Sequence, residues 1–306
     1  MNMSTSAKAV DRTRMSFSLR DQRTLSYAIY GPEEGIPFIM FHGTPGSRIS
    51  MDDEILHEIG VKMIYPERPG YGLSTANPDA TLMSWVADVQ ALLDHLRIEK
   101  FALGGGSGGG PYAMACAAAL SDRMSSLTLI SSAAPQDIPG IRKEMAWGNV
   151  LGYFLSKYAP FLMRYASRSF AKSMLNDPEK AFDQSVMKQV GDTDRRTILA
   201  MKENGTFQVI LDHCREAYIN GAEGHIADMR ILSKDWKINY DKIDCPIHIW
   251  HGEEDTLSPI QGARAMATFL PQAEPHYVTG AGHLLMEIEA VFQDILISVK
   301  ENFIDS

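Results

Sequence analysis

A serine surrounded by glycines is the first feature of this sequence that could do chemistry. Residues 103–113 read LGGGSGGGPYA, and within them Gly105, Ser107 and Gly109 have the spacing GxSxG. This spacing is typical of a nucleophile elbow, a sharp turn from a strand into a helix that exposes a serine hydroxyl above a sheet. Glycines on both sides let the backbone pass close to itself without Cβ clashes. The pattern predicts that Ser107 is a nucleophile.

Other uses of a glycine-rich stretch fit this sequence less well. Residues 104–109 also match GxGxxG, but a dinucleotide site needs an acidic residue about twenty positions later, where this chain reads LTLISSAAP. A P-loop would continue with Gly-Lys-Ser/Thr, which does not follow here. A flexible linker would separate domains, whereas a strand and a helix are expected on either side of this stretch. We therefore expect no nucleotide cofactor.

A serine hydroxyl needs a base, and the base needs an orienting carboxylate. His283 lies in AGHLL, a glycine-flanked turn between the last expected strand and the last expected helix. The carboxylate is expected in HGEEDTLSP, residues 251–259, just after a buried strand. Asp255 is the best candidate, because its short side chain suits a fixed, buried hydrogen bond. Glu253 and Glu254 stay open as alternatives.

Two backbone amides are expected to stabilise the oxyanion of a tetrahedral intermediate. One is the N–H of Gly108, the residue after the nucleophile. The other is the N–H of Thr44 in HGTPGS, the loop that follows the apolar run IPFIMF. No metal is expected, because His248 and His251 are three residues apart on a strand and point to opposite faces.

These residues belong to a series of motifs that resembles the ordered signatures of the α/β-hydrolase superfamily. The motifs are HGTPGS (42–47), ERPGYGLS (67–74), GGGSGG (104–109), HGEEDTLSP (251–259) and AGHL (281–284). They span almost the whole chain, and the chain order Ser107, Asp255, His283 is that of the superfamily. The resemblance implies the α/β-hydrolase fold: a sheet of about eight strands, a helical cap inserted after the sixth strand, and a cis peptide bond between Thr44 and Pro45.

Two residues depart from the family pattern. Glu67 stands where relatives usually carry aspartate, so we expect that loop to have a structural role only. Gly106 replaces the bulkier residue that usually precedes the nucleophile, which removes one wall of the expected site. Serine at the elbow argues against a haloalkane dehalogenase and an epoxide hydrolase.

The resemblance implies a serine hydrolase of the esterase or prolyl aminopeptidase-like branch. We expect it to cleave a small or medium carboxylic ester or lactone through an acyl-enzyme at Ser107, with water as the second substrate and no cofactor. Aminopeptidases, thioesterases, C–C bond hydrolases and perhydrolases use the same triad and stay open. A ligand receptor that keeps the fold and triad is the alternative from another class, and steady multiple turnover would exclude it.

An aminopeptidase would need acidic residues in the cap to bind a free amino terminus. Five acids are available there, although solvated helix faces explain them as well: Glu144, Asp177, Glu179, Asp183 and Glu203.

Repeated strand–helix units must position the site. Continuous apolar runs such as IPFIMF and VKMIYP are expected for strands buried on both faces of a parallel sheet. TLMSWVADVQALLDHLRI has helical spacing, with Thr81 as a possible N-cap. From about residue 136 the pattern is helical, and strands return at CPIHIWHG and AEPHYVTG. We expect an α/β core of residues 1–135 and 239–306, with a mostly parallel sheet, helices on both faces and a helical cap at residues 136–238.

Seven aromatic residues lie between residues 145 and 170 of the expected cap. We expect most of them to pack the cap helices onto each other, and one or two to line an apolar substrate pocket. The seven are Trp147, Tyr153, Phe154, Tyr158, Phe161, Tyr165 and Phe170.

The composition is that of an ordinary globular protein, with 306 residues of which 45% are hydrophobic and 22% charged. The formal charge of −9 argues against nucleic acid and anionic membranes as partners, so we expect an apolar, ester-like small molecule. Three cysteines without CxxC spacing indicate reduced thiols. No run resembles a signal peptide or a transmembrane segment. We expect a cytoplasmic protein, and its oligomeric state stays open.

Overall fold

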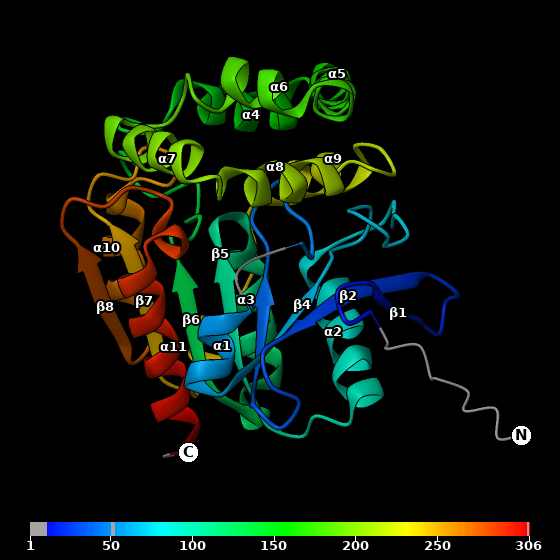
Figure 1. Ribbon diagram of the computed structural model, residues 1–306, viewed down its shortest axis with the longest axis vertical. Coiled ribbons are helices and arrows are strands. Elements are labelled where there is room, and N and C mark those ends of the chain that lie inside the picture. Colours follow the sequence, from blue (N-terminus) through cyan, green and yellow to red (C-terminus); the bar gives the residue numbers. More distant parts are fainter. Residues whose placement is uncertain (1–10, 50–52, 305) are drawn as a thin grey trace, which may run out of the picture.

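The structure of the protein is a computed structural model that describes residues 11–49, 53–304 and 306. Its centre is an eight-stranded sheet with the strand order β1-β2-β4-β3-β5-β6-β7-β8 (Figure 1). β2 pairs antiparallel with β1 and β4, and the other pairs are parallel. The strands are β1 (Met15–Ser18), β2 (Thr24–Tyr30), β3 (Ile36–Phe41), β4 (Val61–Pro66), β5 (Phe101–Gly106), β6 (Met124–Ile130), β7 (Ile247–Gly252) and β8 (Ala273–Val278).

Helices cover both faces of this sheet because successive side chains of its strands point to opposite sides. On β3, Phe38 and Met40 enter one core cluster, and Ile39 and Phe41 enter the other. The first cluster is closed by α1 (Glu54–Ile59) and α11 (Glu289–Ile304); the second is closed by α2 (Leu82–Leu96), α3 (Gly110–Leu120) and α10 (Ile260–Phe269). The predicted fold class, a mostly parallel sheet between helices, is confirmed.

Local signals set the ends of several elements. Thr81 caps α2 in a capping box, because its side chain accepts from the Ser84 amide while the Ser84 side chain accepts from the Thr81 amide. The last helix is preceded by a 3-10 turn at Leu285–Glu287, and α11 starts at Glu289. Among the described residues, no helix is both long and apolar enough to cross a membrane.

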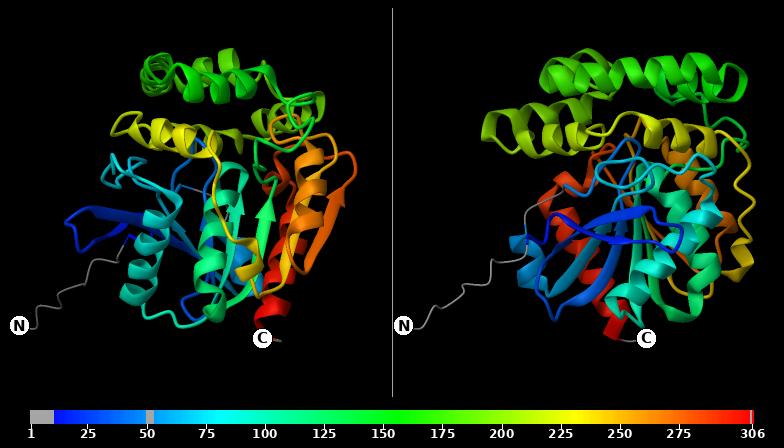
Figure 2. Two further views of the ribbon diagram at one scale, coloured as in Figure 1. Left: turned by 180° about the vertical axis from the view of Figure 1, so that it is seen from behind. Right: turned by 90° about the vertical axis from the view of Figure 1, so that its right-hand side faces the viewer.

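A helical insertion lies between β6 and β7, where the described chain forms no strand. Figures 1 and 2 show it above the sheet in two layers, with α4, α5 and α6 farthest from the sheet and α8 and α9 below them. A core cluster of its own, which includes Met174, Ile198 and Tyr218, holds the helices together. The helices are α4 (Trp147–Tyr158), α5 (Pro160–Asn176), α6 (Pro178–Ser185), α7 (Asp192–Asn204), α8 (Phe207–Glu216) and α9 (Glu223–Leu232).

The expectation that most aromatic residues of α4 and α5 pack inside the insertion is wrong. Five of the seven are more than half exposed: Trp147 67%, Phe154 53%, Tyr158 64%, Phe161 70% and Tyr165 76%. The reason is that α5 buries a different face, formed by Met163, Ser167, Ala171 and Met174. Small and flexible side chains make most of the contacts of α5, and these five aromatic side chains are exposed, whereas Tyr153 and Phe170 pack against core clusters.

Candidate active site

Ser107 lies directly after β5, in the turn that leads into α3. Its φ of 50° lies in the left-handed region, which is strained for a residue with a side chain. The turn needs glycine on both sides, since a Cβ on Gly105 would lie 2.7 Å from the Gly109 carbonyl oxygen. Ser107 therefore has the backbone geometry of a nucleophile elbow.

Two loops at the carboxyl ends of β7 and β8 bring Asp255 and His283 together. His283 Nδ1 donates a hydrogen bond of 2.7 Å to Asp255 Oδ2. Asp255 Oδ1 accepts from the backbone amides of Leu257 and Ser258, each at 2.8 Å. These amides fix the carboxylate, and within the described residues no hydrogen bond occupies His283 Nε2.

The neighbouring acids have other partners. Glu253 accepts hydrogen bonds from Arg264 and Thr279, and Glu254 accepts a short one from Thr193. Of the three acids left open by the sequence, Asp255 is the one that contacts His283. Its catalytic role stays a prediction.

A second histidine, which the sequence analysis did not place in the site, contacts the same carboxylate. His251 Nε2 lies 3.3 Å from Asp255 Oδ2 and donates to the Ser258 carbonyl oxygen at 2.6 Å. His251 is fully buried. It therefore links Asp255 to Ser258 within one loop, while His283 contacts the same carboxylate from the loop after β8.

These contacts shift the pKa values of both Asp255 and His283. Burial alone would raise the pKa of Asp255, but the charges and hydrogen bonds of His283 and His251 bring it well below its ordinary value. Burial alone would lower the pKa of His283, but the charge and hydrogen bond of Asp255 and the charge of Asp194 raise it above its ordinary value. Asp255 is thus a carboxylate that stabilises a protonated His283.

The expected oxyanion donors, Thr44 and Gly108, lie next to each other. A Cβ on Gly108 would lie 2.3 Å from Thr44 Oγ1, and a Cβ on Gly43 would lie 3.3 Å from Ser107 Cβ. Glycine at 108 therefore allows the loop after β3 to reach the elbow. The peptide bond between Thr44 and Pro45 is cis, as the resemblance implied. In the part of the chain that the structure describes, neither amide donates to another residue.

Asp228 of α9 joins the helical insertion to residues 42–47, the loop after β3, which we call the oxyanion loop after the role expected for Thr44. Its Oδ2 accepts hydrogen bonds from Thr44 Oγ1 and from Arg68 Nη2, each at 2.6 Å. The hydroxyls of Tyr71 and Tyr112 donate to the same carboxylate at 2.9 and 2.6 Å. Arg68 and Asp228 are only 1% and 2% exposed, so this ion pair is buried beside the oxyanion loop.

Arg68 also fixes the backbone of that loop. Its Nη1 donates to the His42 carbonyl oxygen at 2.5 Å, and its Nη2 donates to the Gly43 carbonyl oxygen at 2.7 Å. Burial alone would lower the pKa of Arg68, and the charge of Asp228 raises it above its ordinary value. Sequence reasoning missed this network: Arg68 belongs to ERPGYGLS, but no pattern in the helical region distinguishes Asp228.

Asp194, near the start of α7, contacts residues 282–284, the loop of His283, which we call the histidine loop. Its Oδ1 accepts from the Leu284 amide at 3.0 Å, and a Cβ on Gly282 would lie 2.4 Å from the same oxygen. Asp194 is 1% exposed, and its Oδ2 has no hydrogen-bond partner among the described residues. The sequence analysis named other acids of this region, which are exposed or half-buried and lie outside these contacts: Glu144, Asp177, Glu179, Asp183 and Glu203.

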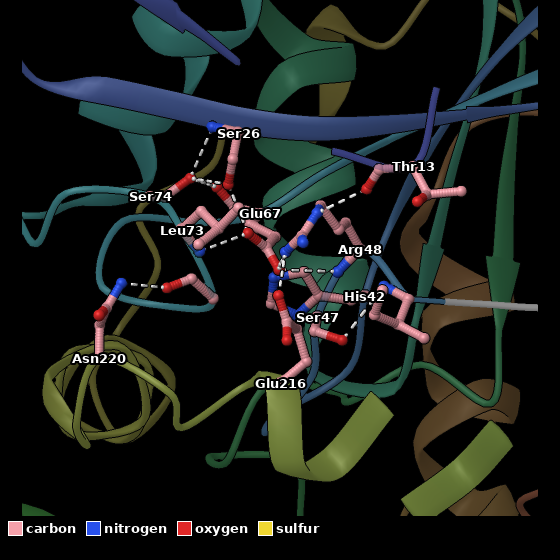
Figure 3. A network of polar contacts seen from close by, with 12 residues as sticks. Thr13, Ser26, His42, Ser47, Arg48, Glu67, Leu73, Ser74, Glu216 and Asn220 are labelled. Atoms are coloured by element: carbon pink, nitrogen blue, oxygen red, sulfur yellow. Dashed lines mark hydrogen bonds and ion pairs between the residues drawn. The ribbon is translucent and has the colours of Figure 1, made fainter. Parts of the chain in front are cut away.

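Glu67 belongs to a separate buried network, drawn in Figure 3. Its carboxylate pairs with Arg48 Nη1 at 2.9 Å and accepts a short hydrogen bond from Ser26. Arg48 also pairs with Glu216 of α8 at 2.5 Å. Glutamate fits because position 72 is glycine: a Cβ on Gly72 would lie 1.9 Å from Glu67 Oε1. These contacts support the structural role expected for this loop.

Two hollows are lined by residues of the segments that connect the insertion to the sheet. A small cavity is lined by Ala133, Tyr153 and Leu257, among others, and the Ala133 amide donates to the Ser107 carbonyl oxygen at 2.9 Å. A groove of about 850 Å³ follows the two segments that connect the insertion to the sheet, 135–142 and 233–241. Gln136 lines both hollows. Tyr153 is thus the member of the aromatic group that lines the smaller hollow.

One group among the described residues could offer metal ligands, and it lies on strands rather than at the site. His248, Glu274 and His276 place their ligand atoms within 4.8 Å of one another. His248 has His276 of the neighbouring strand as its partner, at 3.2 Å, and Glu274 lies 3.8 Å from each. Direct contacts therefore account for the cluster, which shares no residue with the elbow, the Asp255–His283 pair or the oxyanion loop.

An elbow serine, a histidine bound to an aspartate and two adjacent backbone amides, all at the carboxyl edge of a parallel sheet, define an α/β-hydrolase. The chain belongs to the α/β-hydrolase-fold family, whose family model matches residues 36–290. It is therefore an enzyme of the hydrolase superfamily.

Individual relatives are distant. The chain is 24% identical to a proline iminopeptidase of Xanthomonas citri, over 94% of this chain and 95% of that protein. It is also 24% identical to a non-heme chloroperoxidase of Streptomyces lividans, over 92% and 97%. An esterase structure from Thermogutta terrifontis superposes with a TM-score of 0.67 at 22% identity, covering 95% of this chain and 99% of that one. This structural likeness shows the fold alone.

Proposed function

We propose that the protein is a serine hydrolase that cleaves a small or medium carboxylic ester or lactone through an acyl-enzyme at Ser107. The proposal is carried by two features found together in this chain: a φ of 50° at Ser107, and a hydrogen bond of 2.7 Å between His283 and the buried Asp255. The first gives an exposed hydroxyl at an elbow, and the second gives a base with a fixed tautomer.

In the proposed reaction, Ser107 Oγ attacks the carbonyl carbon while His283 Nε2 takes its proton. The Thr44 and Gly108 amides donate to the oxyanion that forms. Collapse of the intermediate breaks the bond to the alkoxide, which receives the proton from His283. Water then attacks the acyl-enzyme with His283 as base, and the carboxylic acid leaves with Ser107 restored.

We further propose that residues 136–238 act as a cap over this site, with the core formed by residues 1–135 and 239–306. Two buried aspartates of the insertion support this, since Asp228 binds the oxyanion loop and Asp194 binds the histidine loop. The three cysteines are free thiols, which supports a reducing compartment such as the cytoplasm.

A second candidate function is an aminopeptidase, and Asp194 is the observation that favours it. The carboxylate oxygen of Asp194 that lacks a hydrogen bond, Oδ2, is buried next to the histidine loop, where an ammonium group of a substrate could satisfy it. One relative is itself a proline iminopeptidase. The two candidates differ in the substrate group that the site must hold: an apolar acyl chain or a cation.

The test is a labelling experiment followed by a substrate panel. A fluorophosphonate probe should add its mass to the peptide that contains Ser107, and a Ser107→Ala variant should stay unlabelled. p-Nitrophenyl esters of increasing acyl length should then turn over many times, whereas amino-acid p-nitroanilides should not. Labelling at another residue would refute the serine mechanism, and a single turnover with retained product would favour a receptor.

A substitution of Asp194 tests the aminopeptidase alternative. If amino-acid anilides are the better substrates, Asp194→Asn should reduce their kcat/KM far more than that of neutral esters. Equal losses on both substrates would mean that Asp194 only supports the histidine loop.

A further inference from the structure

The outermost helices carry an apolar stripe that is exposed in the part of the chain that the structure describes. On α4, Trp147, Leu151, Phe154 and Tyr158 follow the spacing i, i+4, i+7, i+11, which places them on one side of the helix. All four are 44–67% exposed. A stable helix surface normally puts such residues inward, so an exposed stripe of this kind marks an interaction site.

The stripe continues onto the next helix. α4 ends at Tyr158 and α5 begins at Pro160, and Phe161, Leu162 and Tyr165 of α5 are 70%, 45% and 76% exposed. We call the seven side chains on the two helices the aromatic surface: Trp147, Leu151, Phe154, Tyr158, Phe161, Leu162 and Tyr165. Figures 1 and 2 show α4 and α5 in the layer farthest from the sheet, so a large flat partner could reach this surface.

The net charge of residues 145–176, which include α4 and α5, is opposite in sign to that of the whole protein. Residues 145–176 contain four basic residues and no acidic one, whereas the chain has a net charge of −9. The basic residues are Lys157, Arg164, Arg168 and Lys172, and all four are exposed. Among these four, Arg168 has a carboxylate partner within the described residues, Glu223 at 2.7 Å.

We infer that the aromatic surface docks on an anionic lipid bilayer. Interfacial helices combine Trp, Phe and Leu side chains with Lys and Arg, lie in the plane of the membrane and bury one face at the headgroup boundary. Tyr and Trp prefer that boundary because their rings are amphipathic. The four cations add attraction to anionic headgroups.

A second copy of the chain fits this surface less well. In a twofold dimer the same patch meets itself, so Lys157, Arg164, Arg168 and Lys172 would face four identical cations. Like charges brought together in this way oppose association. The net charge of −9 of the whole chain by itself predicts no anionic membrane partner, but all of the excess negative charge lies outside residues 145–176.

The test uses the whole protein and two kinds of vesicle. Vesicles of phosphatidylcholine in which phosphatidylglycerol replaces a third of the lipid should co-sediment the protein, and vesicles of phosphatidylcholine alone should bind it much less. Raising the salt concentration should release the protein, because the attraction of exposed charges is screened. Equal binding to both vesicles, or none to either, would overturn the inference.

Paired variants locate the contact. Arg164→Gln with Lys172→Gln should weaken binding about 30-fold, at about fivefold per lost charge. Phe161→Ser with Tyr165→Ser should weaken it by at least as much through lost apolar contact. Two control variants lie outside the helical insertion: Arg20→Gln removes an exposed cation, and Met83→Ser replaces an exposed apolar side chain. Both should bind like the wild type. Wild-type binding by both paired variants would overturn the inference.

Tryptophan fluorescence gives a second readout. Trp147 is 67% exposed, while Trp85, Trp236 and Trp250 are at most 9% exposed. Anionic vesicles should therefore shift the emission to shorter wavelength in the wild type and leave it unchanged in Trp147→Phe. A different result would be a protein that does not bind vesicles but forms a dimer, with the double variant Phe161→Ser and Tyr165→Ser dissociating that dimer. The aromatic surface would then be an interface between copies, and the lipid inference would be wrong.

Discussion

Substitution of Asp228 tests whether the helical insertion positions the oxyanion loop. Asp228→Asn leaves the guanidinium of Arg68, which is 1% exposed, without a counter-charge. Breaking one side of a buried pair costs about 3–5 kcal/mol of the free energy of unfolding. The same change weakens the 2.6 Å hydrogen bond from Thr44 Oγ1. If the Thr44 amide then leaves the oxyanion position, kcat falls by about 10²–10³.

A double variant separates the two effects. Arg68→Met with Asp228→Leu removes both charges, and apolar replacement of a buried pair is often neutral or stabilising. Urea unfolding should therefore show most of the lost stability restored. Turnover of a p-nitrophenyl ester should stay low, because the double variant also lacks the hydrogen bonds of Arg68 to the His42 and Gly43 carbonyl oxygens.

Asp88 provides the matched control. Its buried carboxylate forms an ion pair at 2.6 Å with Arg23, which is partly exposed, and among the described residues neither side chain hydrogen-bonds to the loop of Thr44. Asp88→Asn should lower the free energy of unfolding and leave kcat unchanged. The reasoning is refuted if the Arg68–Asp228 double variant is both stable and fully active, since the network would then serve stability alone.

Three further predictions concern the triad and its surroundings. Asp255→Asn should reduce kcat by about 10⁴ by imposing the wrong histidine tautomer, whereas Glu254→Gln should stay within about tenfold, and the opposite ranking would assign the acid to Glu254. kcat/KM should rise with pH through an apparent pKa above about 6.5, because His283 must lose a proton that Asp255 and Asp194 help it hold. Asp194→Asn should move this rise to lower pH, and an unchanged profile would contradict that role. Dialysis against EDTA should leave kcat unaltered, because no residue of the proposed reaction needs a metal; a loss restored by zinc would implicate the histidine–glutamate cluster of β7 and β8.

Short-range patterns were enough to predict the sheet and the elbow. Buried strands are continuous apolar runs, and the GxSxG turn depends on Gly105 and Gly109, where a Cβ would clash with nearby backbone. The pairing of Asp255 with His283 was also within reach, because both follow the ends of adjacent parallel strands. Glycine, apolar runs and strand ends are visible in the sequence because the forces that select them act locally.

The contacts from the insertion were decided by the tertiary structure. Arg68 and Asp228 are separated by 160 residues, and Asp194 and Leu284 by 90, so no local spacing links them. The sequence shows an acidic residue on an amphipathic helix in the same way whether its side chain faces water or a buried guanidinium. The aromatic residues of α4 and α5 show the converse: their helical spacing is readable, but which side of a helix is buried depends on the neighbour that packs against it. Here α5 packs through Met163, Ser167, Ala171 and Met174, and five of the seven aromatic side chains of α4 and α5 are left exposed.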